Sequence, residues 1–160
     1  DLRAQLYKNV GESLERISTP EVDLLIQTMP PFPWHFGGQS FHNLFVDPEE
    51  TLAFCNEWEF GICLDISHSA MAAVFLEKSV NAWIELLAKW IRHMHLSDSA
   101  GLDGEGLQVG EGELDYKQIC ESLNAHLPNI SFIPEIWQGH VDGGEASFKA
   151  LVELHRLGLR

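Results

Sequence analysis

Basic side chains are scarce in this sequence, where 10 Lys and Arg stand against 24 Asp and Glu and give a formal net charge of −14. A chain with this charge repels phosphate backbones and anionic lipid surfaces. No uninterrupted apolar run reaches the roughly 18 residues that a membrane-spanning helix requires. We therefore expect neither nucleic acid nor a membrane among the partners of this protein.

Cysteine is also scarce, and its placement argues against a disulfide framework. Cys55, Cys63 and Cys120 are odd in number, far apart and set in apolar or helical contexts. Thiols in such a pattern are much more often buried and reduced than paired in a disulfide or in a CxxC metal site. The cysteines thus indicate a reducing compartment, and we expect a cytoplasmic protein.

The apolar content is that of one ordinary globular domain, since 45% of the 160 residues are hydrophobic and 21% are charged. Such a composition shows no sign of disorder and is sufficient to build a core. The first residue is Asp1 rather than Met, and the chain enters a helical pattern at once. We expect that the sequence begins in the middle of a fold.

Four short apolar runs have the length of buried strands, and a helical pattern follows each of them. An earlier helix is closed by Thr19-Pro20, because the residue before a proline avoids helical backbone angles. The next helix begins with Asp47 as N-cap and Pro48 in the first helical position. The predicted strands span residues 22–27, 60–65, 91–96 and 130–135, and the predicted helices span 1–18, 47–58, 69–90, 114–127 and a last segment from 145.

One helix followed by four strand–helix units amounts to half of a (β/α)8 TIM barrel, an α/β fold. Half a barrel cannot close alone, since an open array exposes the barrel-lining face and two unpaired edges. We therefore expect residues 1–160 to be a single domain, the C-terminal half of a barrel in a longer parent chain. An N-terminal half or a second subunit would close it. A compact doubly wound sheet is the alternative.

Asp65, His95 and Glu135 each stand at the end of a predicted strand, and Gln27 has the same place on the first strand. The carboxyl ends of parallel strands meet at one edge, so we expect these side chains to converge. Mixed carboxylate and imidazole ligands suit a divalent cation such as Mn²⁺, Zn²⁺, Co²⁺, Fe²⁺ or Mg²⁺. A single strand-end Asp or His is as often an ordinary cap or turn residue, and it is the recurrence on successive strands that favours a metal site.

Other residues and loops lie near these strand ends. His68 would stand at the rim of the same pocket. His93 would point to the same face as His95, one layer deeper, where a hydrogen-bonded core histidine is the more common role. The loop 34–46 is rich in Gly, His, Asn and aromatic residues, as functional loops are. The acidic, Gly-rich loop 97–113 is either a solvated face or a segment that closes over a polyol.

The motifs at the strand ends resemble, in order and spacing, the second half of the xylose-isomerase-like TIM barrels. That superfamily includes sugar-phosphate isomerases and epimerases, ketose 3-epimerases, hydroxypyruvate isomerase, dehydroshikimate dehydratase and the endonuclease IV group. The stretch Pro134–His140 is also similar to barrel domains of bacterial surface-sugar synthesis. The motifs that make up the resemblance are Asp65-Ile-Ser-His68, Ile91-Arg-His-Met-His95-Leu-Ser-Asp98, Val109-Gly-Glu-Gly-Glu-Leu-Asp115 and Ile133-Pro-Glu135.

The resemblance implies metal ligands at Asp65, His95 and Glu135, and at Gln27, where the family has glutamate. It also implies that Glu135 acts as a base and that His68 holds a substrate hydroxyl. An amide at position 27 does neither base nor acid work at neutral pH, so two-base epimerisation is in doubt. One-base chemistry at Glu135 through an enediolate-type intermediate remains open. Substrate contacts are expected from His68, Trp137, Asp98 and Trp34.

We thus expect a metal-dependent isomerase, epimerase or related lyase that acts on a small sugar, a sugar phosphate or a hydroxy-carbonyl compound. The alternative is a degenerate, non-catalytic barrel domain that binds a sugar-like ligand or serves as an assembly partner in surface-sugar biosynthesis. The endonuclease branch is disfavoured, because residues 103–108 contain no histidine that could supply additional metal ligands.

Overall fold

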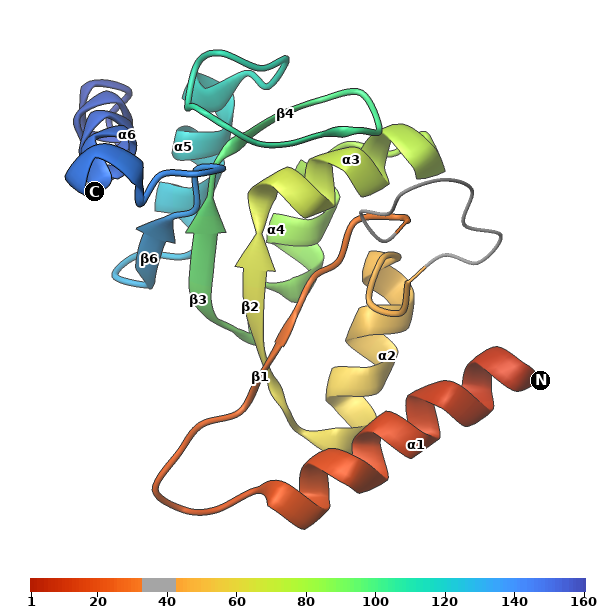
Figure 1. Ribbon diagram of the computed structural model, residues 1–160. Helices are drawn as coiled ribbons and strands as arrows, with labels where there is room; N and C mark the ends of the chain where they lie inside the picture. Colours follow the sequence, from red (N-terminus) through yellow and green to blue (C-terminus); the bar gives the residue numbers. More distant parts are fainter. Residues whose placement is uncertain (33–42) are drawn as a thin grey trace.

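Helices and strands alternate along the chain in the computed structural model, which describes residues 1–32 and 43–160 (Figure 1). The strands are β1 (Leu25–Gln27), β2 (Gly61–Asp65), β3 (Ile91–Leu96), β4 (Asp98–Ala100), β5 (Gly104–Leu107) and β6 (Ser131–Pro134). The helices are α1 (Leu2–Ile17), α2 (Pro48–Trp58), α3 (Ile66–Leu76), α4 (Asn81–Leu87), α5 (Tyr116–His126) and α6 (Glu145–Arg156), with a short 3-10 turn η1 (Val141–Gly144).

The main sheet is parallel throughout and has the strand order β1-β2-β3-β6. Its register pairs Asp65 with His95, and His95 with Ile133. The carboxyl ends of neighbouring strands therefore lie at the same edge, and the chain returns through helices between one strand and the next (Figure 1). This architecture confirms the predicted α/β class with a parallel, TIM-barrel-like sheet.

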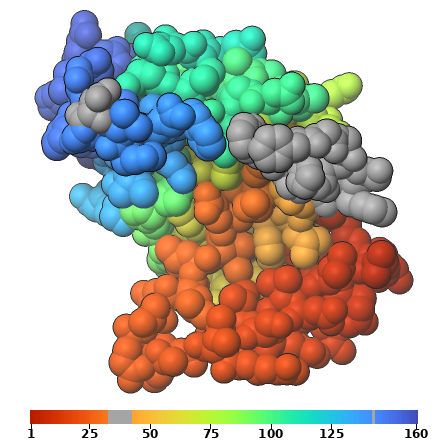
Figure 2. Space-filling view, in the orientation of Figure 1, coloured from red at the N-terminus to blue at the C-terminus, as the bar shows by residue number. Residues whose placement is uncertain are grey.

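The hydrophobic core lies between one face of the sheet and the helices. Ile62 and Leu64 of β2, together with Met94 and Leu96 of β3, are at most 2% exposed and belong to one cluster with residues of α4 and α5. Alternate strand residues point to the opposite face. In Figure 2 the orange chain of β1 lies at the surface between the red N-terminal helix and the blue C-terminal segments. The opposite face of the central strands bears Cys63, Asp65, His93, His95, Ser131 and Ile133.

Helix α2 begins as its sequence predicted. The Asp47 carboxylate accepts hydrogen bonds from the backbone N–H groups of Glu49 and Glu50, and Pro48 occupies the first turn. The helix then packs against α1 through an aromatic cluster of partly or fully buried side chains. The cluster consists of Tyr7, Phe45, Phe54 and Trp58.

Residues 69–90 form two helices, α3 and α4, rather than the single helix predicted. The apolar spacing continues across the break, but Glu77 ends α3 in the left-handed conformation with φ 54°. The next residue, Lys78, forms ion pairs with Asp47 and Glu49 at the start of α2. A contact between segments distant in the sequence thus accompanies the break, and the local pattern contains no sign of it.

Two strand predictions also need correction. The segment 97–113, predicted as a loop, contains the antiparallel hairpin β4–β5, in which Asp98 pairs with Leu107. The first strand is shorter than the predicted 22–27 and begins at Leu25. The sequence Gly-Glu-Gly-Leu of β5 has neither the β-branched residues nor the alternation from which strands are predicted.

The three thiols are buried, as their contexts predicted. Burial raises the pKa of Cys55 and of Cys120 to about 11, so both are thiols rather than thiolates at neutral pH. Across the described ranges, no helix is both long enough and apolar enough to cross a bilayer.

Candidate functional site

Three titratable side chains meet at the carboxyl edge of the sheet. Asp65 is the last residue of β2, His95 is near the end of β3, and Glu135 directly follows β6. One potential ligand atom of each lies within 4.8 Å of those of the other two. The His95 Nδ1 atom is 2.5 Å from Glu135 Oε2 and 3.7 Å from Asp65 Oδ2. The backbone fixes this meeting point, since Asp65 pairs with His95 and the Glu135 N–H donates to Leu96 at 3.1 Å.

Charge complementarity holds this cluster together. The neighbouring Asp65 carboxylate, the Cys63 thiol and the Glu135 carboxylate raise the pKa of His95 to about 12. Hydrogen bonding to His95 in turn lowers the pKa of Glu135. The side chain of Asp65 is 3% exposed and that of Glu135 is 52% exposed, so one carboxylate is fixed in the fold and the other faces solvent.

The donor set fits a divalent cation. Two carboxylates and one imidazole nitrogen surround a single point, and mixed oxygen and nitrogen ligands of this kind bind Mn²⁺, Co²⁺, Zn²⁺ and related ions. A cation placed there would take over from the His95 proton in holding the two carboxylates together. Asp65, His95 and Glu135 are therefore the residues that would hold such an ion.

Gln27, the last residue of β1, lies beside the same point. Its Nε2 atom donates a hydrogen bond to Asp65 Oδ2 at 3.0 Å and lies 3.3 Å from His95 Nδ1. In this orientation the amide supports Asp65, whereas a half-turn about its last bond would present the carbonyl oxygen instead. Gln27 thus occupies the fourth position of the predicted ligand set, with a neutral group in place of a carboxylate.

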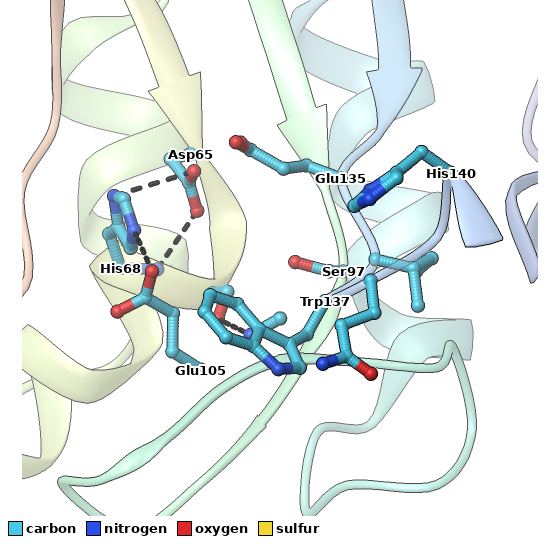
Figure 3. Close-up of a pocket in the computed structure, with 11 residues that line it drawn as sticks. Asp65, His68, Ser97, Glu105, Glu135, Trp137 and His140 are labelled. Carbon is cyan, nitrogen blue, oxygen red and sulfur yellow. Dashed lines mark hydrogen bonds and ion pairs between the residues drawn. The ribbon is translucent and has the colours of Figure 1, made fainter.

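His68 stands in the first turn of α3, which Asp65 caps by accepting the His68 N–H at 3.0 Å. Its ring is held on both sides, because Nδ1 is 2.9 Å from the Thr28 carbonyl oxygen and Nε2 is 3.2 Å from Glu105 Oε1. Figure 3 shows the contact with Glu105. Burial by itself would lower the pKa of His68, but the bond to Glu105 and the charge of Asp65 raise it above its usual value. The ring is therefore fixed between the Thr28 carbonyl oxygen and the Glu105 carboxylate.

The hairpin β4–β5 brings Glu105 to His68 through its neighbour Gly106. The Gly106 N–H donates to the Ser67 hydroxyl at 3.1 Å, and its carbonyl accepts the Trp137 N–H at 2.7 Å. A φ of +68° and a backbone only 3.2 Å from where a Cβ would sit both favour glycine there. This single residue links the hairpin to α3 and to the segment after β6.

A cavity of about 450 Å³ opens beside the cluster of Asp65, His95 and Glu135. Figure 3 shows Asp65, His68 and Glu105 along one wall, with Glu135, Ser97, Trp137 and His140 around the remainder. Gln27 and His95 do not line the cavity, but both contact Asp65, which does. The lining residues are Asp65, Ser67, His68, Ser97, Glu105, Gly106, Glu135, Ile136, Trp137, Gln138 and His140.

One predicted substrate contact, Asp98, does not line this cavity. Asp98 is fully buried, and its carboxylate accepts backbone hydrogen bonds from Ser99, Gly110 and Leu114 at 2.8–3.2 Å. The prediction of Asp98 as a substrate contact is therefore corrected, because both oxygens of its carboxylate already accept hydrogen bonds from backbone N–H groups of the loop. Trp34 lies outside the residues that the structure describes.

Sequence reasoning missed Glu105, Ser97 and His140 as cavity residues. Glu105 was grouped with a solvated acidic loop, because a hairpin that folds back over a strand end has no local signature. Ser97 directly follows β3, and this position after a strand could have marked it. His93 hydrogen-bonds Ser131 Oγ at 2.8 Å, and its ring centroid is 5.5 Å from that of His95, which agrees with the predicted supporting position one layer deeper.

The sequence matches the family described as xylose isomerase-like TIM barrel over residues 1–156. The uncharacterized protein MJ1311 of Methanocaldococcus jannaschii is 27% identical over 123 residues, which cover 73% of this chain and 38% of that protein. The crystal structure of a D-tagatose 3-epimerase-like protein matches with a TM-score of 0.62 at 21% identity, over 96% of this chain and 54% of that one. At that identity the likeness shows the fold alone. The chain spans about half the length, or less, of these two relatives.

Proposed function

The chain belongs to the xylose isomerase-like TIM barrel family, and from that premise we propose that it takes part in the metal-dependent isomerisation or epimerisation of a small sugar or related hydroxy-carbonyl compound. One observation above all supports the proposal. Asp65, His95 and Glu135 offer their ligand atoms within 4.8 Å of one another beside a cavity of about 450 Å³. In TIM-barrel enzymes the active site lies at this carboxyl edge.

Glu135 is the group we assign to proton transfer at the carbon next to a carbonyl. Its carboxylate lines the cavity, is half exposed, and is kept ionised by its hydrogen bond to His95, which lowers its pKa. A bound divalent cation would supply polarisation of the substrate carbonyl. His68 is the group we assign to a substrate oxygen, because its ring lines the same cavity, with Nε2 3.2 Å from Glu105 Oε1.

Gln27 restricts this chemistry to one base. An amide neither accepts nor releases a proton at neutral pH, and the side chain instead donates a hydrogen bond to Asp65 at 3.0 Å. We therefore propose proton removal and return by Glu135 rather than exchange between two strand-end glutamates. Because the structural relative is a D-tagatose 3-epimerase-like protein, ketoses are the first substrates to test.

The remainder of the barrel is part of the proposal. Among the described residues, no further strand pairs with the outer edges of β1 and β6. We propose that an N-terminal half or a second subunit completes the barrel and with it the cavity. We retain as a second candidate a non-catalytic domain that binds a sugar-like ligand, because Gln27 removes one carboxylate from the ligand set. The two candidates differ in whether the protein exchanges a carbon-bound proton.

Loss of a carbon-bound proton to solvent deuterium tests the proposal. The full-length protein with Mg²⁺ is incubated in D₂O with D-tagatose or D-fructose, and the proton spectrum of the sugar is followed by NMR. We expect exchange next to the carbonyl, abolished in Glu135→Gln and retained in Glu111→Gln, a matched change at an exposed residue outside the cavity lining. Metal binding without exchange of either ketose would favour the non-catalytic candidate.

A further inference from the structure

The chemistry of the cavity wall points to the class of ligand. We propose that the cavity takes an uncharged, polyhydroxylated ligand, a free sugar rather than a sugar phosphate, with Ser97, Glu105 and Trp137 as its contacts. This inference rests on the proposed function and narrows its substrate. Three observations support it. The loops after the strands lack lysine and arginine, the Asp98 carboxylate already accepts backbone N–H groups of the glycine-rich loop, and the side chains that face the cavity suit hydroxyl groups.

None of the segments that follow the four strands of the main sheet contains a lysine or an arginine. Arg16 and Lys78 enclose the segments after β1 and β2, and no lysine or arginine occurs between them. The segment after β3 has none before Lys117, and the segment after β6 has none before Lys149. In TIM barrels, phosphate is often bound by the loops after the last two strands. Here those loops have no arginine or lysine with which to grip it.

Backbone N–H groups in a glycine-rich loop are the other common phosphate site. In this chain the loop after β4–β5 already encloses an anion of its own. The buried Asp98 carboxylate accepts the N–H groups of Ser99, Gly110 and Leu114 at 2.8, 3.0 and 3.2 Å. These three backbone N–H groups already bond the Asp98 carboxylate and are not available to a phosphate.

The groups that do face the cavity suit hydroxyls. Ser97 is 1% exposed, its hydroxyl points into the cavity in Figure 3, and no residue within the described ranges hydrogen-bonds that hydroxyl. The hydroxyl is open to the cavity rather than sealed in the core, so a ligand there can hydrogen-bond it. Glu105 adds a carboxylate whose Oε1 pairs with His68. A hydroxyl is both donor and acceptor, so it can satisfy either group.

Trp137 supplies an apolar surface beside these polar groups. It lines the cavity and is 58% exposed, while its backbone N–H is fixed to Gly106 at 2.7 Å. The exposed part of this indole can pack against the C–H face of a sugar, and the sugar hydroxyls can then bond Ser97 and Glu105. A phosphate group would instead meet the carboxylates of Asp65, Glu105 and Glu135, and no lysine or arginine is found among the described residues that line the cavity.

Paired ligands that differ only by a phosphate test this inference. The full-length protein with Mg²⁺ is titrated by calorimetry with D-tagatose and D-fructose, and then with their 6-phosphates. We expect at least one free ketose to bind, and its 6-phosphate to bind at least tenfold more weakly. Ser97→Ala and Trp137→Ala should each weaken the free sugar severalfold, whereas Asp103→Asn and Phe148→Ala, exposed controls outside the cavity lining, should not.

Glu105→Gln provides an independent test. It should weaken binding of the free sugar and also reduce the difference in affinity between each free sugar and its 6-phosphate. Equal or tighter binding of the 6-phosphates would overturn the inference and leave the proposed function intact. Mg²⁺ binding with no affinity for any of the four sugars would also overturn it. Absence of both metal and sugar binding would remove the proposed function as well.

Discussion

Asp65 and Asp98 both follow apolar strands and are both buried, yet they have opposite roles. The Asp98 carboxylate accepts backbone N–H groups from three residues of its own loop. The Asp65 carboxylate caps α3 through one oxygen and meets the side chains of Gln27, His68 and His95 through the other. A carboxylate that bonds backbone groups has a structural role. A carboxylate that contacts titratable side chains beside a cavity is a candidate for a functional site.

The comparison also explains why position after a strand is an incomplete guide. Sequence motifs placed both aspartates at strand ends, and the resemblance assigned both to the site. The difference lies in the loop that follows. After β3 the hairpin β4–β5 turns back over the strand end, so Asp98 is enclosed while Glu105 reaches His68. The acidic group that faces the cavity from this loop is thus contributed by the hairpin.

The largest expected effect comes from removing the structural carboxylate. Asp98→Ala leaves the buried N–H group of Ser99 and the partly buried hydrogen bonds of Gly110 and Leu114 without an acceptor, and we expect a loss of roughly 3 kcal/mol in the free energy of unfolding. Asp103→Ala on the same hairpin is the matched control and should change it by less than about 0.5 kcal/mol. Urea denaturation followed by circular dichroism measures both. A near-neutral Asp98→Ala would make the structural assignment wrong.

The second prediction removes the charge of Asp65 and keeps its cap. Asn caps helices about as well as Asp, so Asp65→Asn should change the free energy of unfolding by no more than about 1 kcal/mol. Loss of a metal ligand should lower the affinity for Mn²⁺ by at least about 100-fold, since removal of a residue that only supports a ligand already lowers metal affinity by about 10–100-fold. Calorimetric titration with Mn²⁺ measures this. Unchanged Mn²⁺ affinity would place Asp65 with Asp98 as a purely structural residue.

Gln27→Glu should shift metal affinity and stability in opposite directions. A third carboxylate at the cluster should strengthen Mn²⁺ binding by about tenfold, because affinity rises with the charge of the ligand set. Without metal, the variant should lose about 1 kcal/mol of stability, since the hydrogen bond from Gln27 to Asp65 becomes a like-charge contact. Thermal melts with and without Mn²⁺ measure both effects. Parallel changes of one sign would show that position 27 does not contact the metal.

The smallest effect concerns Glu50. Like Asp65 it pairs with a charged side chain, and like Asp98 it lies outside the cavity lining. Its pairing with Arg3 at 2.6 Å lowers its pKa below the usual value. Stability from this pair is therefore present above the unfolded pKa, near 4.5, and is lost as pH falls through the lower folded value. The side chain is 38% exposed, so solvent screening keeps the contribution under about 1 kcal/mol. Glu50→Gln should lower stability at pH 7, and its difference from the wild type should shrink as the pH falls below about 4.5. A difference that stays constant with pH would contradict this expectation.

Strand positions were predictable because an apolar run ending in a polar residue is a local property. Asp65 and Glu135 could be named in advance for that reason, since each directly ends or follows such a run. Convergence followed from the rule that parallel strands end at one edge. The same local logic identified Asp47 and Pro48 as a helix start.

The features that sequence could not supply are those set by contacts between distant segments. The break before α4 accompanies ion pairs from Lys78 to the start of α2. Glu105 reaches the cavity because Gly106 is bonded to Ser67 on one side and to Trp137 on the other. Neither arrangement leaves a periodicity or a motif in the chain, so no local pattern could reveal it.

A crystal of the full-length protein soaked in MnCl₂ tests the central claim most directly, through the anomalous signal of manganese. The account predicts one strong peak bounded by Asp65, His95 Nδ1 and Glu135, and its loss in Asp65→Asn. Manganese bound elsewhere, or no peak at these three side chains at millimolar Mn²⁺, would contradict the assignment of this cluster as a metal site.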